Sequence, residues 1–185
     1  MSYVDELVSA YSRFVSFRWQ AGLAPAQRVW MAVYPPTDER RLRLHLPNFE
    51  MATVDAGHDW AEIDITTSFE RWMVEQEYRE EYFKSPELLA PALPSFLEHL
   101  ATSVRSELEA SPSPSGVVGL VGAGALFGLG DAIRVSALLN EVNESIAGRL
   151  LVFFPGEYEG NGYRLLDAQD GWNYLATPIT PNGSH

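Results

Sequence analysis

The sequence contains no cysteine among its 185 residues. This absence excludes disulfide bonds, zinc sites built from thiolates and catalysis by a cysteine nucleophile. Histidine and carboxylate side chains remain as metal ligands, and the one cluster with that composition is Asp55, His58, Asp59 and Glu62. The cluster crosses a predicted loop-to-strand junction rather than one helix face, so we predict no metal site.

Long apolar runs are also absent. No stretch reaches the about 18 consecutive apolar residues that a membrane-spanning helix needs. The first residues, MSYVDELVSAYSRF, carry acidic side chains where a signal peptide would be apolar. These two observations predict a cytoplasmic protein with no membrane partner.

Basic residues are few. The chain has 13 Lys and Arg against 25 Asp and Glu, which gives a formal net charge of -12. A field of this sign repels the phosphates of nucleic acid unless a local basic patch overcomes it. The basic groups at 13–18 and 40–43 are better explained as solvated helix faces, so we expect no direct binding of nucleic acid.

What the sequence does contain is the pattern of one α/β domain. Short apolar runs rich in β-forming residues predict strands at 28–34, 60–66, 116–121 and 150–154. Between them lie amphipathic stretches that predict helices, including one capped by Ser2 and Asp5 and a second one that breaks at Pro47. The alternation predicts a mostly parallel sheet flanked by helices on both faces.

The end of the chain departs from this alternation. Residues 163–166 and 172–176 flank the Asp-Gly-containing segment 167–171, and this spacing predicts an antiparallel hairpin at the sheet edge. The low apolar content after residue 177 predicts a loose tail over 178–185. We therefore expect a single α/β domain over residues 1–177.

Three glycines follow the third predicted strand, at Gly122, Gly124 and Gly128. A glycine-rich turn between a strand and a helix is where an anion is often bound. No Gly-Lys-Ser/Thr follows, however, and the fourth predicted strand ends at Phe154 and Pro155 without an acid for a ribose or a magnesium ion. A tight strand-to-helix turn explains the glycines better. A nucleotide-responsive or hydrolytic domain that uses this loop remains the alternative.

Arg134, Ser136 and Asn140 lie on the helix predicted over 131–145, and the last two share one face of it. Polar groups among apolar neighbours need partners. They satisfy nearby backbone and acidic groups, or they form a binding surface, and both interpretations stay open.

The segment Pro155–Gly160 follows the carboxyl end of the fourth predicted strand, the edge at which open α/β sheets place their sites. We expect Gly156 and Gly160 to serve turns with positive φ. Glu157 and Glu159 have no nucleophile beside them, and no Gly-x-Ser-x-Gly elbow occurs. The sequence therefore predicts no catalytic residue.

Three ordered motifs resemble the BrxB family of the bacteriophage-exclusion (BREX) phage-defence systems. They are the apolar strand and Gly-x-Gly of 118–124, the run RVSALLN at 134–140 and the run LLVFFPGEYEG at 150–160. The run VYPP at 33–36 and Asp64 resemble the ends of that family's first two strands. The likeness extends over roughly residues 28 to 177, consistent with one domain.

The resemblance implies a small non-enzymatic core component without a cofactor. Members of the family are encoded beside a large ATPase, a DNA methyltransferase and an alkaline-phosphatase-like PglZ protein. A bridging role between the PglZ-like protein and the ATPase is implied, with the methyltransferase as a further partner. We expect the partner-facing surface to include Arg134, Ser136, Asn140 and, in the following turn, Pro155, Gly156, Tyr158 and Gly160.

Overall fold

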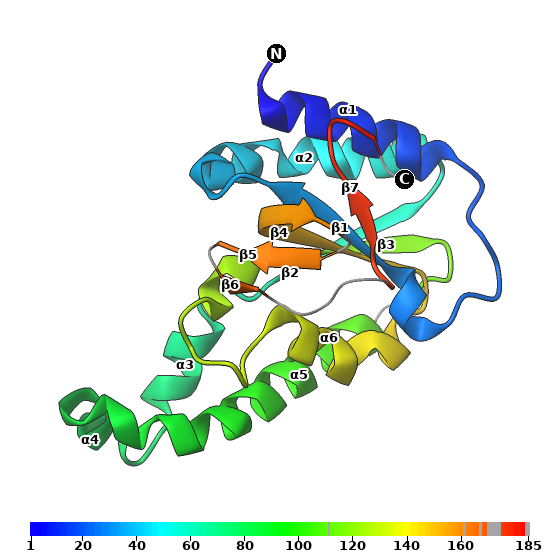
Figure 1. Cartoon of the computed structure of the whole chain (residues 1–185). Helices are drawn as coiled ribbons and strands as arrows, with labels where there is room; N and C mark the ends of the chain where they lie inside the picture. The colour runs from blue at the N-terminus through cyan, green and yellow to red at the C-terminus, as the bar shows by residue number, and fades with distance from the viewer. Residues whose placement is uncertain (111, 161, 167, 170–174, 184–185) are drawn as a thin grey trace.

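The computed structural model describes residues 1–110, 112–160, 162–166, 168–169 and 175–183. Its centre is a sheet in the order β2-β3-β4-β1-β7. These strands are β1 Val29–Tyr34, β2 Asp59–Asp64, β3 Gly116–Val121, β4 Arg149–Glu159 and β7 Thr177–Ile179. Every neighbouring pair in this order is parallel, so the carboxyl ends share one edge (Figure 1). The predicted α/β fold with a mostly parallel sheet is confirmed.

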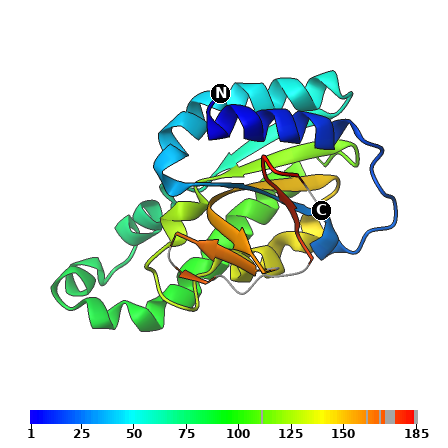
Figure 2. The ribbon, with the colours of Figure 1, turned by 45° about the horizontal axis from the view of Figure 1, so that its top comes forward.

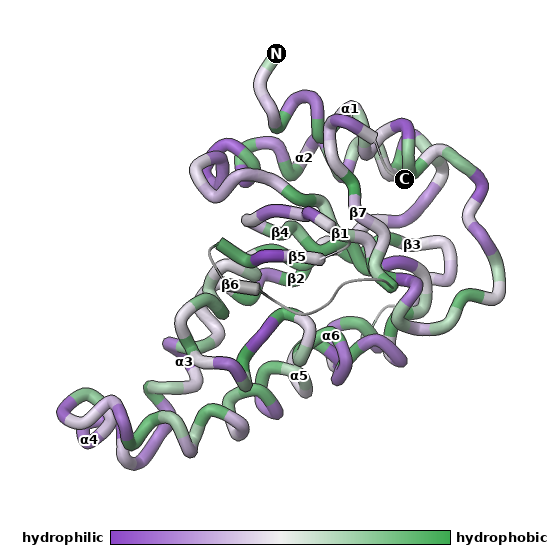
Figure 3. The backbone as a smooth tube through the Cα atoms, viewed as in Figure 1, coloured by the Kyte–Doolittle hydropathy of each residue, from purple (hydrophilic) through white to green (hydrophobic). Residues whose placement is uncertain are grey.

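Helices cover both faces of the sheet (Figure 1). One face carries α1 Tyr3–Ser16 and α2 Glu39–Asp55, and the other carries α3 Ser68–Val74, α5 Leu93–Ala110 and α6 Val135–Val142. Successive strand residues feed opposite cores, because side chains alternate along a strand: Trp30 and Phe153 face α1 and α2, whereas Met31 and Phe154 face the other layer. Along the helices, hydrophobic and hydrophilic residues also alternate, as the colours of Figure 3 show.

The first helix begins as its spacing predicts. The Ser2 hydroxyl accepts a hydrogen bond from the Asp5 amide at 3.3 Å, and the Asp5 carboxylate accepts one from the Ser2 amide at 2.8 Å. This reciprocal pair satisfies two amides that the helix itself leaves without partners.

The second helix continues through Pro47, so the predicted break there is wrong. Proline cannot donate to the carbonyl of Arg43 and typically costs a helix interior about 3 kcal/mol. Leu42 and Phe49, on either side of Pro47, are fully buried against α1 and the sheet. Each such burial contributes roughly 1.5–3 kcal/mol, so packing on both sides outweighs the lost hydrogen bond.

The central strand β4 runs beyond the parallel sheet. Its first part pairs with β1 up to Pro155, opposite Tyr34, and its last part pairs antiparallel with β5 Gly162–Leu165. Strand β5 pairs in turn with β6 Ala168–Gln169. The turn predicted to begin at Pro155 is therefore strand up to Glu159, and the chain turns at Gly160, whose φ is +56°.

Gly156 does not have the positive φ predicted for it. Its constraint is space: a Cβ atom at this position would overlap the backbone carbonyl oxygen of Arg164 in β5. Glycine is thus required where β4 passes from the parallel sheet into the antiparallel ribbon.

Residues 177–179 belong to the sheet rather than to a loose tail. Thr177–Ile179 form β7, which pairs with β1 at the sheet edge, and Ile179 is buried. Residues 178 and 179 were predicted to belong to the tail, so that boundary lies too early. Most of the second predicted hairpin strand, 172–176, falls outside the described residues, and the antiparallel pairing that the structure describes is made by β4, β5 and β6.

The helix after the glycine loop is shorter than the predicted 131–145. It begins at Val135 and ends at Val142, followed by a 3-10 turn over Asn143–Ser145. Arg134 has an extended backbone, with φ of -107° and ψ of 156°, so the helix cannot begin before Val135.

From the last residue of α3 to the start of α5 the chain forms a helical arm, residues 74–92, that projects from the sheet layers (Figures 1 and 2). It contains α4 Arg79–Lys84 and 3-10 turns at Pro86–Leu88 and Ala90–Ala92. No helix among the described residues is long and apolar enough to cross a lipid bilayer.

Candidate functional site

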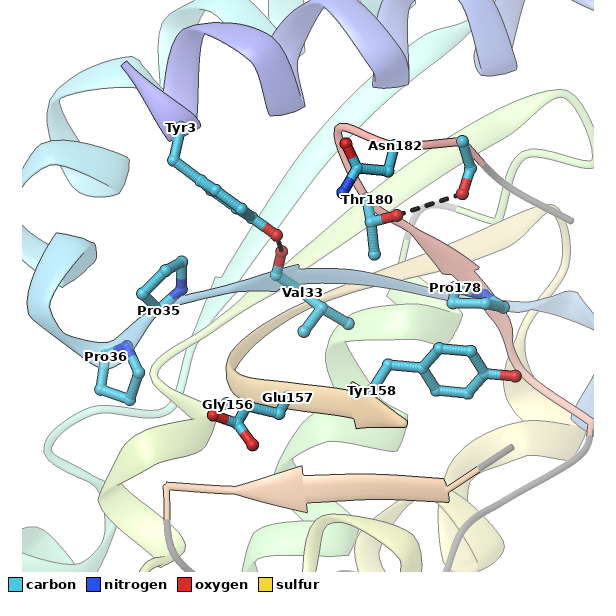
Figure 4. A pocket seen from close by; sticks show the side chains of 11 residues that line it. Tyr3, Val33, Pro35, Pro36, Gly156, Glu157, Tyr158, Pro178, Thr180 and Asn182 are labelled. Carbon is cyan, nitrogen blue, oxygen red and sulfur yellow. Dashed lines mark hydrogen bonds between the residues drawn. The ribbon is translucent and has the colours of Figure 1, made fainter. Parts of the chain in front are cut away.

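A cleft of about 570 Å³ opens at the carboxyl edge of the sheet (Figure 4). Its walls are the start of α1, the end of β1, the extension of β4 and the turn that follows β7. We call it the carboxyl-edge cleft and define it by the residues that line it: Tyr3, Val33, Pro35, Pro36, Gly156, Glu157, Tyr158, Pro178, Thr180, Asn182 and Gly183.

The topology explains why a cleft forms here. The chain leaves β1 toward α2 on one face of the sheet, whereas it leaves the adjacent β4 toward β5, whose Tyr163 and Leu165 belong to the core of the opposite face. Adjacent strands whose connections diverge in this way leave a crevice at their carboxyl ends, the usual binding position in open α/β sheets.

Proline and tyrosine side chains shape the cleft. Pro35 and Pro36 end β1, because proline lacks the amide that would continue the ladder. The Tyr3 hydroxyl donates to the Val33 carbonyl at 3.2 Å, which ties the start of α1 to the end of β1 (Figure 4). On the β4 side, the half-buried Tyr158 lies against Tyr163, with ring centroids 4.8 Å apart.

The cleft offers little acid–base chemistry. Its lining includes one carboxylate, that of the exposed Glu157, which is paired in register with Arg164 on β5. Burial, with the negative charges of Asp38 and Glu6, raises the pKa of Tyr3 above its usual value, so its hydroxyl stays protonated at neutral pH. Rigid rings of proline and tyrosine suit contact with another polypeptide, since tyrosine is enriched at protein interfaces.

A polar network lies beside the cleft and joins α2 to two strand ends. The Tyr34 hydroxyl donates a hydrogen bond to the Glu39 carboxylate, which forms an ion pair with Arg43 at 2.8 Å. Arg43 reaches across to the end of β2, where it contacts Asp64 at 3.4 Å and the Thr66 hydroxyl at 2.7 Å. We call these five residues the edge network.

The electrostatics of the edge network fix its charges. Burial alone would raise the pKa of Asp64, but hydrogen bonds from Thr66 and the charge of Arg43 bring it below its usual value. Burial, and the hydrogen bond to the Glu39 carboxylate, raise the pKa of Tyr34 far above its usual range. Neither group changes its charge near neutral pH, so the network is suited to holding elements together rather than to transferring protons.

The glycine loop closes the same edge at β3. Gly122 has a φ of +95°, and a Cβ atom there would lie 2.5 Å from the Thr66 hydroxyl oxygen. A Cβ atom on Gly124 would lie 3.2 Å from Cγ of Pro155, so the loop also contacts the end of β4. At Gly128 a Cβ atom would meet no neighbour within 4 Å, so glycine is favoured there only by the φ of +82°.

The amides of this loop are partly committed to its own turns. Ala125 donates to the Gly122 carbonyl at 3.0 Å, and Phe127 donates to the Gly124 carbonyl at 3.1 Å. Because α6 begins only at Val135, the loop does not lead directly into a helix N-terminus. This geometry favours the tight-turn interpretation, and anion binding by the loop stays the untested alternative.

Ser136 and Asn140 lie on α6 and Arg134 lies at its start, and none of the three lines the cleft. Pro155, in β4, and Gly160, after β4, are also not among the residues that line it. Arg134 is the N-cap residue of α6 rather than part of the helix, and its guanidinium pairs with the exposed Asp131 at 2.9 Å. Ser136 is half-buried and Asn140 is exposed. Of the predicted partner-facing residues, the structure therefore brings Gly156 and Tyr158 into the cleft and leaves the α6 group on the covering helix layer.

The acidic and histidine side chains near β2 contact different partners. His58 stacks on Trp19 with ring centroids 3.8 Å apart, Asp59 accepts a hydrogen bond from Ser113 at 2.6 Å, and Glu62 accepts one from Trp60 at 3.1 Å. Within the described part of the chain, no group of three or more histidine, aspartate or glutamate side chains is arranged to hold a metal ion.

Sequence reasoning missed most of the edge network and also Tyr3. Two local signals were present: the i,i+4 spacing of Glu39 and Arg43, and Asp64 two residues before Thr66 at a strand end. Neither signal says that the two pairs meet, since this depends on how α2 crosses the sheet.

Comparison with known proteins adds a family. A family model described as BREX protein BrxB matches residues 61–179, well over half of the chain. This range extends from β2 to β7 and includes the helical arm, the glycine loop and the β4 extension. Searches of curated proteins and of solved structures found no match.

Proposed function

The chain belongs to the BREX protein BrxB family, and from this premise we propose that it joins partner proteins of a BREX phage-defence system without performing chemistry of its own. Membership of the family makes the chain a BREX component. The bridging role, and the choice of a PglZ-like protein and a large ATPase as partners, are the proposal. The methyltransferase of the system is a further candidate partner.

The observation that carries the proposal is a pair of separate exposed surfaces. A bridging protein needs two contact regions that do not overlap. The carboxyl-edge cleft is one of them. The helical arm, which projects from the layer of α3 and α5, is the other (Figures 1 and 4).

The arm has the composition of a contact surface. Four of its large apolar side chains are exposed: Val74 at 65%, Tyr78 at 58%, Phe83 at 73% and Leu88 at 51%. Exposed apolar side chains gathered on one projection are typical of interaction sites. The arm also carries five glutamates against one arginine and one lysine, so it fits a partner surface that is apolar with a basic rim.

A matched pair of substitutions tests the role of the arm. Phe83 and Leu44 are almost equally exposed, at 73% and 72%, but Leu44 lies on α2, away from the arm. The chain is co-expressed with the two proposed partners, a PglZ-like protein and a large ATPase of a BREX system, and purified through a tag on this chain. We expect Phe83→Ser to lose a co-purifying partner that Leu44→Ser retains. Equal recovery of both partners with the two variants would remove the arm from the proposal.

A further inference from the structure

Arg149 is a buried cation at the amino edge of the sheet, the edge opposite to the cleft. It is the first residue of β4, and only 7% of its surface is exposed. Its guanidinium carbon lies 5.0 Å from the ring centroid of Trp19 and 5.9 Å from that of Trp30. His58 stacks on Trp19, and its Nδ1 lies 3.0 Å from the Ser115 carbonyl, so the indole is held in place.

The hydrogen-bond partners of this guanidinium are neutral. Nη1 donates to the Gly148 carbonyl at 3.0 Å, and Nη2 donates to the Gln20 carbonyl at 2.8 Å. No carboxylate among the described residues forms an ion pair with it. Burial, together with the positive charge of Arg28, lowers the pKa of Arg149. A charged side chain is rarely buried without an opposite charge, so an anion would complement the guanidinium of Arg149.

The same guanidinium lines an open hollow of about 420 Å³. Four aromatic rings and a second, exposed arginine share the lining, and these residues are Phe14, Phe17, Trp19, Trp30 and Arg18. A guanidinium has five N–H donors, and two of those on Arg149 are used by the two carbonyls. Donors therefore remain for a ligand that accepts a forked pair of hydrogen bonds.

We propose that this hollow binds an oxyanion, a carboxylate or a phosphate group, with Arg149 as its anchor and Arg18 as a second, solvent-facing cation. Arginine holds both groups through two parallel hydrogen bonds, and stacking against indole keeps its planar fork in position. The site lies at the opposite edge of the sheet from the carboxyl-edge cleft, so it is independent of the bridging role.

Titration of the purified protein tests the site. Sodium phosphate, sodium benzoate and sodium chloride are compared at pH 7 and equal ionic strength, with tryptophan fluorescence and melting temperature as readouts. We expect phosphate or benzoate to give a saturable change, because Trp19 and Trp30 border the site, and chloride to give none. The oxyanion with the lower half-saturating concentration shows whether the hollow prefers a phosphate or a carboxylate. Absence of saturation with both oxyanions would overturn the proposal.

Three substitutions make the test specific. Arg18→Gln is expected to raise the half-saturating concentration about tenfold, the usual loss for one charge-assisted hydrogen bond. Arg13→Gln changes an exposed arginine on α1 that does not line the hollow; it is the control and should leave binding unchanged. Arg149→Lys keeps a positive charge but removes the fork, so a folded variant should lose saturation. Unchanged binding in Arg18→Gln, or in a folded Arg149→Lys, would overturn the proposal, and Arg18→Gln alone decides the matter if Arg149→Lys does not fold.

Discussion

Gly156 and Arg164 approach so closely across the β4–β5 ribbon that a side chain on the glycine would occupy the position of the arginine's carbonyl oxygen. This contact sets the path of β4 as it leaves the parallel sheet. The same path carries Glu157 and Tyr158 into the wall of the carboxyl-edge cleft. The shape of the cleft therefore depends on one missing side chain.

Gly156→Ala should destabilise the protein by about 1–3 kcal/mol, the usual range for an overpacked site. Gly162, in the same ribbon, is the control, because a Cβ atom there meets nothing nearer than the Glu159 carbonyl oxygen at 3.6 Å. Gly162→Ala should change the free energy of unfolding by no more than about 0.5 kcal/mol. Urea unfolding of the two variants measures the difference, and equal stabilities would show that the ribbon adapts to the added methyl group.

Gly122→Ala should cost more than Gly22→Ala, although both glycines have positive φ, +95° and +71°. A non-glycine residue in this conformation loses about 1–2 kcal/mol. Around Gly22 there is open space, whereas a Cβ atom on Gly122 would also press on Thr66. The excess cost for Gly122, measured by the same unfolding method, reports the contact between the glycine loop and the edge network. Equal costs for the two substitutions would show that the glycine loop can shift away from the edge network without loss of stability.

The edge network should respond to acid through Asp64. In the folded chain its pKa lies below the ordinary 3.8, so the ionised carboxylate contributes stability above that value and loses it as the pH falls through the folded-state pKa. The stability difference between the wild type and Asp64→Asn should be constant from about pH 5 to 7 and shrink below about pH 4. Urea unfolding at several pH values measures it. A difference that does not change with pH would show that the charge of Asp64 is not what matters.

Nucleotides should leave the melting temperature unchanged, because the Gly122–Gly128 loop is explained by turn geometry and by its contacts with Thr66 and Pro155. A thermal-shift series with ATP and GTP, with and without magnesium, checks this expectation. Saturable stabilisation, which reaches about 2.7 kcal/mol at a hundredfold the dissociation constant, would instead support the nucleotide-responsive alternative.

Local signals predicted local structure well. The spacing of Ser2 and Asp5 predicted the capping box, and the apolar run of 116–121 predicted β3, both of which the structure shows. Predictions became wrong where distant packing overrides local preference. Helix α2 passes through Pro47 because Leu42 and Phe49 are buried on either side of it.

The site was predictable only in part, because it is made by strand order. The sequence predicts a strand end at Pro155 and Gly156, but it does not say that β4 continues to Glu159, that β4 lies beside β1 or that β7 returns to the same edge. The cleft and the edge network depend on those neighbours. The sequence also does not show why glycine is required at position 156, because the constraint comes from the neighbouring strand β5 and not from the residue's own φ.

The bridging claim is tested most directly by the mass of the assembled complex. The chain is mixed with a PglZ-like protein and a large ATPase of a BREX system, singly and together, and each mixture is sized by light scattering after gel filtration. The account predicts a particle that contains all three proteins, and no particle of the two partners when this chain is left out. If the partners assemble equally well without it, or if each displaces the other from it, the chain does not bridge them.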